Sequence, residues 1–121
     1  MKSNIFILAI LMMLLASSCS SAPKAVPVKV YSEPAGGFVI YRVDREADKD
    51  APWIYLGTTP VESVLYIEKK TANKANKLSI RVMKEGYFDI HKDWEGEKIK
   101  DEVEERKMLF WNPNLVQQKA K

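Results

Sequence analysis

The chain has 121 residues, 46% of them hydrophobic, and its 19 basic and 16 acidic side chains give a formal net charge of +3. This length and hydrophobic content suit one domain with a buried core. So small a charge excludes the strongly basic surface that is typical of nucleic-acid-binding domains. The single cysteine excludes an intrachain disulfide, so burial of apolar side chains must stabilise the fold.

Residues 1–18 have the organisation of a secretory signal. Lys2 precedes an apolar run over residues 5–16, and small residues lead from there to Cys19. The run is shorter than the roughly 20 apolar residues that a transmembrane helix needs. Its end, Leu15-Ala16-Ser17-Ser18-Cys19, resembles the lipobox of bacterial lipoproteins. We therefore expect residues 1–18 to be a lipoprotein signal peptide.

The lipobox resemblance implies that Cys19 is lipidated and becomes the first residue of the mature chain. Several acyl chains on one residue bind a bilayer far more tightly than a single chain, so residues 19–27 would tether the domain to a membrane. The residue after the cysteine is Ser20 rather than aspartate, which in Gram-negative lipoproteins points to the outer membrane. The competing interpretation is an ordinary signal peptide cleaved after Ala22, which would discard Cys19.

Beyond the tether, short strands are predicted because apolar and polar residues alternate or form brief apolar runs between turns. The predicted strands are residues 26–31, 38–43, 53–56, 61–67, 78–83 and 87–90. The intervening turns at residues 32–37, 57–60 and 84–86 contain the glycine and proline that tight turns need. This pattern predicts an all-β fold, a small antiparallel sandwich or barrel.

The stretch from Lys98 to Trp111 is compatible with two structures. Ile99, Val103 and Phe110 lie near helical spacing, and acidic residues precede basic ones, which suits a helix dipole. A strand that ends in residues 108–111 fits the same sequence equally well. The last residues, 114–121, are predicted to be a polar C-terminal tail.

Three motifs together resemble the PEGA domain, a small β-sandwich module of bacterial envelope proteins. They are, in order, Ser32-Glu33-Pro34-Ala35-Gly36-Gly37, Leu56-Gly57-Thr58-Thr59-Pro60 and Lys84-Glu85-Gly86-Tyr87. The resemblance covers residues 28–113 and implies an antiparallel β-sandwich, with a strand rather than a helix over Val103–Trp111. Gly37 stands where the family usually has alanine. The motif residues are structural, so the resemblance implies no activity, and we expect Gly57 and Gly86 to be positions where a side chain would clash.

Aromatic side chains are the first candidates for a ligand surface. Trp53 and Tyr55 are predicted on the same face of one strand, where exposed rings could stack on sugars or anchor a protein partner. Trp94 and Trp111 are further candidates of the same kind. The alternative is that all four rings cover the sheet as part of the core, and their exposure distinguishes the two interpretations.

A lysine-rich loop is the second candidate surface. Lys69, Lys70, Lys74 and Lys77 accompany only one acid, Glu68, and could bind peptidoglycan carboxylates or lipid phosphates. A solvated loop would have the same composition.

Neither a metal site nor a catalytic site is predicted. Asp44, Glu46, Asp48 and Asp50 alternate as in a calcium loop, but Lys49 occupies the glycine position, so we interpret them as a solvated loop. Asp89, His91 and Asp93 would share one face of a strand, yet structural zinc usually takes four protein ligands. His91 is the only histidine, and no serine has the surroundings of a catalytic nucleophile. We therefore expect no cofactor and no enzymatic activity.

The sequence predicts an outer-membrane-anchored lipoprotein whose domain is a structural or interaction module of the cell envelope. Its partners would be the membrane, through lipidated Cys19, and an envelope protein or peptidoglycan. The alternative is a carbohydrate- or peptidoglycan-binding domain that uses Trp53, Tyr55, Lys69 and Lys70. Exposure of Trp53 and Tyr55 would keep that alternative open, and burial of both would remove its main support.

Overall fold

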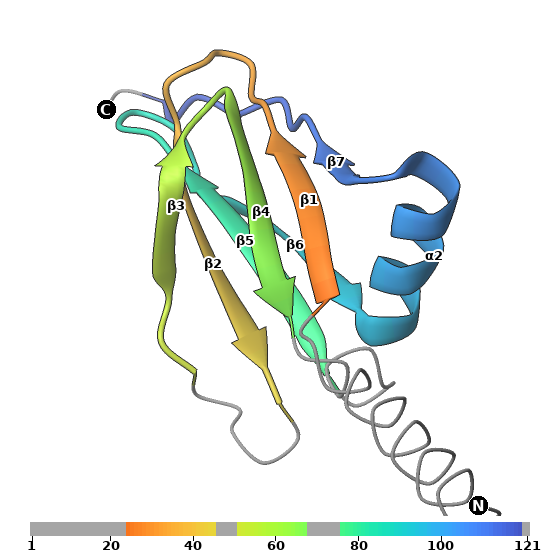
Figure 1. Ribbon diagram of the computed structural model, residues 1–121. Coiled ribbons are helices and arrows are strands. Elements are labelled where there is room, and N and C mark those ends of the chain that lie inside the picture. Colours follow the sequence, from red (N-terminus) through yellow and green to blue (C-terminus); the bar gives the residue numbers. More distant parts are fainter. Residues whose placement is uncertain (1–23, 46–50, 68–75, 120–121) are drawn as a thin grey trace, which may run out of the picture.

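The computed structural model describes residues 24–45, 51–67 and 76–119 and confirms the predicted all-β sandwich (Figure 1). Seven strands and one helix occupy these ranges. They are β1 (Lys24–Val30), β2 (Phe38–Asp44), β3 (Ile54–Thr58), β4 (Val61–Ile67), β5 (Lys77–Met83), β6 (Ile90–Glu95), α2 (Gly96–Arg106) and β7 (Leu109–Trp111).

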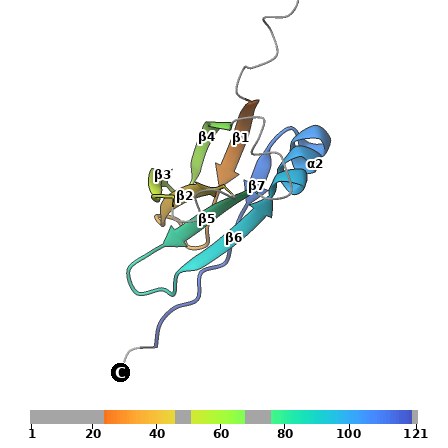
Figure 2. The ribbon, with the colours of Figure 1, turned by 90° about the horizontal axis from the view of Figure 1, so that it is seen from below.

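The strands form two sheets that face each other (Figure 2). The smaller sheet has the order β4-β1-β7, with β1 antiparallel to β4 and parallel to β7. The larger sheet has the order β3-β2-β5-β6, and all of its neighbouring strands are antiparallel. Chain neighbours β3 and β4 therefore belong to different sheets, and the turn between them carries the chain across the sandwich.

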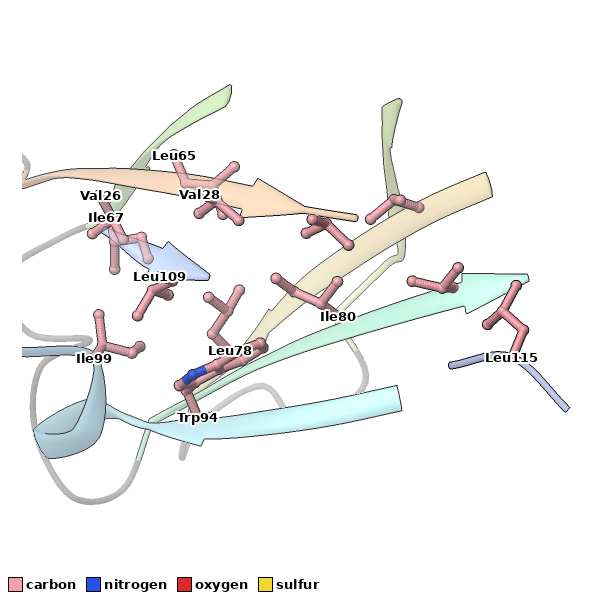
Figure 3. Packing of buried hydrophobic residues seen from close by; sticks show 13 residues of the cluster. Val26, Val28, Leu65, Ile67, Leu78, Ile80, Trp94, Ile99, Leu109 and Leu115 are labelled. Atoms are coloured by element: carbon pink, nitrogen blue, oxygen red, sulfur yellow. The ribbon is translucent and has the colours of Figure 1, made fainter. Parts of the chain in front are cut away.

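The core lies between the sheets because alternate residues of the central strands point inward (Figure 3). Strand β1 contributes Val26, Val28 and Val30, and β5 contributes Leu78, Ile80 and Val82. Other buried apolar residues come from the flanking elements: Val39, Leu65, Ile67, Trp94, Ile99, Leu109 and Leu115. Burying one such side chain contributes about 1.5–3 kcal/mol, which suits a fold with no disulfide.

Helix α2 and strand β7 share the stretch that the sequence left ambiguous. The PEGA-based expectation of a strand over Val103–Trp111 is wrong up to Arg106 and agrees with the structure only at β7. The helix forms because Ile99 is buried and Val103 packs against the core one turn later. It ends at Lys107, whose left-handed backbone (φ 67°) lets its N–H bond the carbonyl of Val103 at 3.0 Å.

The first two PEGA-like motifs meet in space and are joined by one buried threonine. The Thr59 hydroxyl accepts hydrogen bonds from the backbone N–H groups of Gly36 at 3.1 Å and Gly37 at 2.9 Å. It also shares a hydrogen bond with the Ser32 hydroxyl at 2.6 Å. Backbone bonds between Thr59 and both glycines complete the junction. These residues therefore hold two turns together and are structural.

The two glycines at which the sequence predicts a clash differ. A Cβ at Gly57 would come within 2.7 Å of Val61 Cγ2, so that prediction is confirmed. A Cβ at Gly86 would meet no atom within 4 Å, so a clash there is wrong. The backbone of Gly86 explains the glycine instead, because its φ of +84° is one that other residues rarely adopt.

Gly37→Ala should destabilise the domain by about 1–3 kcal/mol, because an added Cβ would lie 2.6 Å from Val82 Cγ1. Urea denaturation followed by circular dichroism measures the free energy of unfolding. Val82→Ala removes the obstructing methyl group, so the double variant should lose less stability than the two single variants added together. A Gly37→Ala protein as stable as the wild type would contradict this contact.

The segment predicted as a polar tail is hydrogen-bonded to the sandwich as far as Gln118. The N–H of Leu115 donates to the carbonyl of Glu33 at 2.8 Å, and the Leu115 side chain is buried. Beyond it, the N–H of Phe88 donates to the carbonyl of Val116 at 2.9 Å, and the N–H of Gln118 donates to Gly86 at 2.8 Å. The structural unit thus includes residues beyond Pro113.

Candidate functional site

The predicted functional residues fall into three groups. Cys19, Lys69, Lys70 and Lys74 lie outside the residues that the structure describes. Lys77, the last lysine of the loop, is described and begins β5, where its ammonium lies 3.7 Å from a carboxylate oxygen of Asp93. The aromatic candidates are all described, and the structure separates them into core and surface.

Trp94 and Trp111 belong to the core side of the sandwich. Trp94 is only 2% exposed, and its ring meets that of Trp111 edge to face at a centroid distance of 6.2 Å. The indole N–H of Trp94 donates to a carboxylate oxygen of Glu102 in α2 at 3.2 Å. That bond satisfies the one polar atom of the indole ring. Trp94 is thus excluded as a surface for ligands.

Trp53 and Tyr55 lie together on the outer face of the larger sheet. Tyr55 pairs with Ile40 of β2, which pairs with Arg81 of β5, so these three side chains share the face that points away from the core. The ring of Trp53, one residue before β3, lies over that same Arg81. Tyr55 is 59% exposed and Trp53 is half-buried. Because the two rings are not both buried, the interpretation of this strand as a ligand surface stays open.

Two arginines accompany these rings. The guanidinium carbons of Arg42 and Arg81 each lie 4.6 Å from the Trp53 ring centroid. Such cation–π contacts contribute about 0.5–1 kcal/mol each at exposed sites and hold the indole against the sheet. Phe38 continues the surface toward Tyr55, with ring centroids 6.1 Å apart. We call the five residues Phe38, Arg42, Trp53, Tyr55 and Arg81 the aromatic–arginine face.

Among the described residues, only one of the two arginines of this face forms an ion pair. Arg42 Nε lies 3.3 Å from a carboxylate oxygen of Asp44, its neighbour on the same side of β2. Within the described ranges, no carboxylate forms an ion pair with Arg81. Across β5 and β6, Arg81 is paired with His91, which is exposed. The face therefore combines flat apolar rings with guanidinium donors.

This arrangement can bind a ligand in two ways. Exposed aromatic rings stack on the apolar faces of sugars or pack against a protein side chain. A guanidinium group donates two parallel hydrogen bonds to a carboxylate or phosphate. Because the core is formed on the opposite side of the sheet, the exposed rings of Phe38 and Tyr55 can contact other molecules.

The other polar clusters that the sequence offers lie around β6 and in the loop after β2. His91 and Asp93 lie on the outer face of β6, and Asp93 accepts a hydrogen bond from the Ser79 hydroxyl at 2.7 Å. Asp89 precedes the strand. Within the part of the chain that the structure describes, no three histidine, cysteine, aspartate or glutamate residues are grouped to hold a metal ion. The remaining acids of the calcium-like loop, residues 46, 48 and 50, lie outside that part.

Sequence reasoning missed three members of the face: Phe38, Arg42 and Arg81. Arg42 could have been found from the sequence, because it is the one charged residue in the run 38–43 and a charged side chain there indicates an outward position. Its link to Arg81 depends on the register of β2 against β5, which turn and alternation patterns do not define.

Comparisons with protein-family models, curated proteins and solved structures found no match to this chain. The resemblance to the PEGA domain therefore stays a prediction. No helix among the described residues is long and apolar enough to span a membrane.

Proposed function

We propose that this protein is an outer-membrane lipoprotein whose β-sandwich is a non-enzymatic interaction module of the cell envelope. The signal-like residues 1–18 and the lipobox-like position of Cys19 support the export and the anchor. The aromatic–arginine face supports the binding role, and it is the observation that carries the proposal. Lipidation of Cys19 would hold the chain at the membrane while the aromatic–arginine face binds an envelope component.

The exposed rings are the main support for a binding role. Phe38 and Tyr55 are 55% and 59% exposed although they are adjacent on a sheet whose other face is buried. Exposed apolar surface of this kind, bordered by polar groups, is typical of interaction sites. Aromatic and arginine side chains also dominate the residues that contribute most to binding free energy at interfaces.

A saccharide that carries carboxylates is the ligand class that this face favours. The exposed ring of Tyr55 and the half-buried ring of Trp53 offer stacking surfaces for sugars, and Arg81, whose guanidinium lies over Trp53, offers donors for an acidic group. Peptidoglycan presents both features, since its glycan strands bear peptides with carboxylates. Peptidoglycan is therefore our second candidate, and it is more specific than the general role of an envelope interaction module.

Co-sedimentation of the detergent-solubilised mature protein with purified peptidoglycan tests this ligand. Trp53→Ala and Arg81→Ala should each weaken binding about tenfold, the equivalent of about 1.4 kcal/mol. Phe110→Ala is the matched control, because Phe110 is an exposed aromatic on the smaller sheet. Equal binding by all variants would exclude the aromatic–arginine face. If the wild type does not sediment, a photo-crosslinker at Tyr55 in intact cells should capture a protein partner instead.

A further inference from the structure

A second exposed surface, distinct from the aromatic–arginine face, lies on the outer side of the smaller sheet. At the end where β1 begins, Ala25 is paired with Tyr66, and Pro27 is paired with Val64. Tyr66 is 74% exposed and Val64 is 45% exposed, although both belong to a regular strand. The next outward row holds the ion pair between Lys29 and Glu62, with a nitrogen–oxygen distance of 3.2 Å.

The position of the anchor determines what can cover this surface. β1 begins at Lys24, five residues after Cys19, and five residues span at most about 18 Å when fully extended. A lipid on Cys19 therefore keeps the start of β1 within that distance of the bilayer. The C-terminal segment after β7 lies at the opposite end of the sandwich (Figure 1).

The order of side chains along β1 and β4 matches the order of polarity at a membrane surface. Rows of outward-facing side chains on a sheet are about 7 Å apart along the strands. With the strands along the bilayer normal, the rows of Tyr66 and Val64 therefore span a depth comparable to one headgroup layer, about 5–7 Å. Tyrosine is enriched at this depth, because its ring is apolar and its hydroxyl is polar. The charged row of Lys29 and Glu62 follows farther from the anchor, where water is expected.

We propose that the anchor-proximal apolar surface, defined as Ala25, Pro27, Val64 and Tyr66, docks on the lipid headgroup layer and fixes the orientation of the domain. The inference rests on the proposed lipidation of Cys19. A shallow groove of about 240 Å³ runs from Pro27 and Val64 to Lys29 and Glu62, so it joins the apolar surface to the charged row. The aromatic–arginine face lies on the outer side of the other sheet, with Arg42 toward the anchor end of β2 and Phe38 at the opposite end.

Spin labelling of the full lipidated protein tests the docking. Lipidation consumes the only native thiol, so Val64→Cys introduces a single site for a nitroxide while Tyr66 stays intact. The labelled protein is reconstituted into vesicles of phosphatidylethanolamine and phosphatidylglycerol and isolated by flotation. The label should be more accessible to oxygen, which partitions into lipid, and less accessible to a water-soluble nickel complex than a label on Val116→Cys. Val116 is exposed and lies in the distant C-terminal segment.

The outcomes are distinguishable. Adding Tyr66→Glu to Val64→Cys should return the label to the water accessibility of the Val116 site, because a carboxylate disfavours the headgroup layer. A floated protein whose Val64 label is as water-accessible as the Val116 label would overturn the docking alone. Dipolar broadening between labels would overturn it in favour of a second copy on the same surface. A protein that does not float would overturn the proposed anchor and, with it, this inference.

Discussion

Trp94→Ala is expected to destabilise the domain by about 3–5 kcal/mol. The indole is almost fully buried and joins three elements: it packs against Leu78 within the larger sheet, contacts Trp111, and bonds Glu102 of α2. Truncation would leave a large cavity and an unpaired carboxylate. Because domains of this size have only about 5–15 kcal/mol of stability, much of it would be lost.

Urea denaturation followed by circular dichroism measures this loss without relying on tryptophan fluorescence. Phe88→Ala is the matched control, because Phe88 is a large aromatic that is mostly exposed, and its loss should change stability by about 0.5 kcal/mol or less. A Trp94→Ala domain that unfolds at the same urea concentration as the control would contradict the packing of α2 and β6 on the core.

Cys19→Ala is expected either to move the protein from the membrane fraction to the soluble fraction or to leave it as unprocessed precursor. Each buried methylene of an acyl chain contributes about 0.8 kcal/mol to membrane binding, so loss of the acylated residue removes the dominant attachment. Fractionation and immunoblotting measure the distribution. Ser20→Ala is the matched control, because it changes the adjacent residue and leaves the thiol intact. A fully processed membrane pool in Cys19→Ala cells would contradict the anchor.

The strands could be predicted where alternation is strict. Leu78, Ile80 and Val82 face the core and Arg81 faces out, as their spacing indicates. The stretch after Lys98 could not be assigned, because its apolar spacing fits a helix and its last residues fit a strand, and the structure contains both. Burial of Ile99 against the sandwich decides in favour of the helix, and that contact is tertiary rather than local.

Only part of the candidate site could be predicted from the sequence. Trp53 and Tyr55 could be paired because they are two residues apart in one predicted strand. Trp94 has the same chemistry, yet its position opposite Leu78 places it in the core. The contribution of Arg81 depends on strand pairing between β2 and β5, which brings together residues that are far apart in the chain. Sequence patterns predict where strands lie in the chain better than they predict which strands pair in the sheet.

The most direct test of the central claim is the intact mass of the protein extracted from membranes, combined with the mass of its N-terminal peptide. The proposed lipoprotein predicts a mature chain that begins at Cys19 and carries a diacylglyceryl group on sulfur and an acyl chain on the amino group. A chain that begins at Pro23 with no added lipid would contradict it. That result would mean ordinary cleavage after Ala22, and with it both the anchor and the docked orientation would be lost.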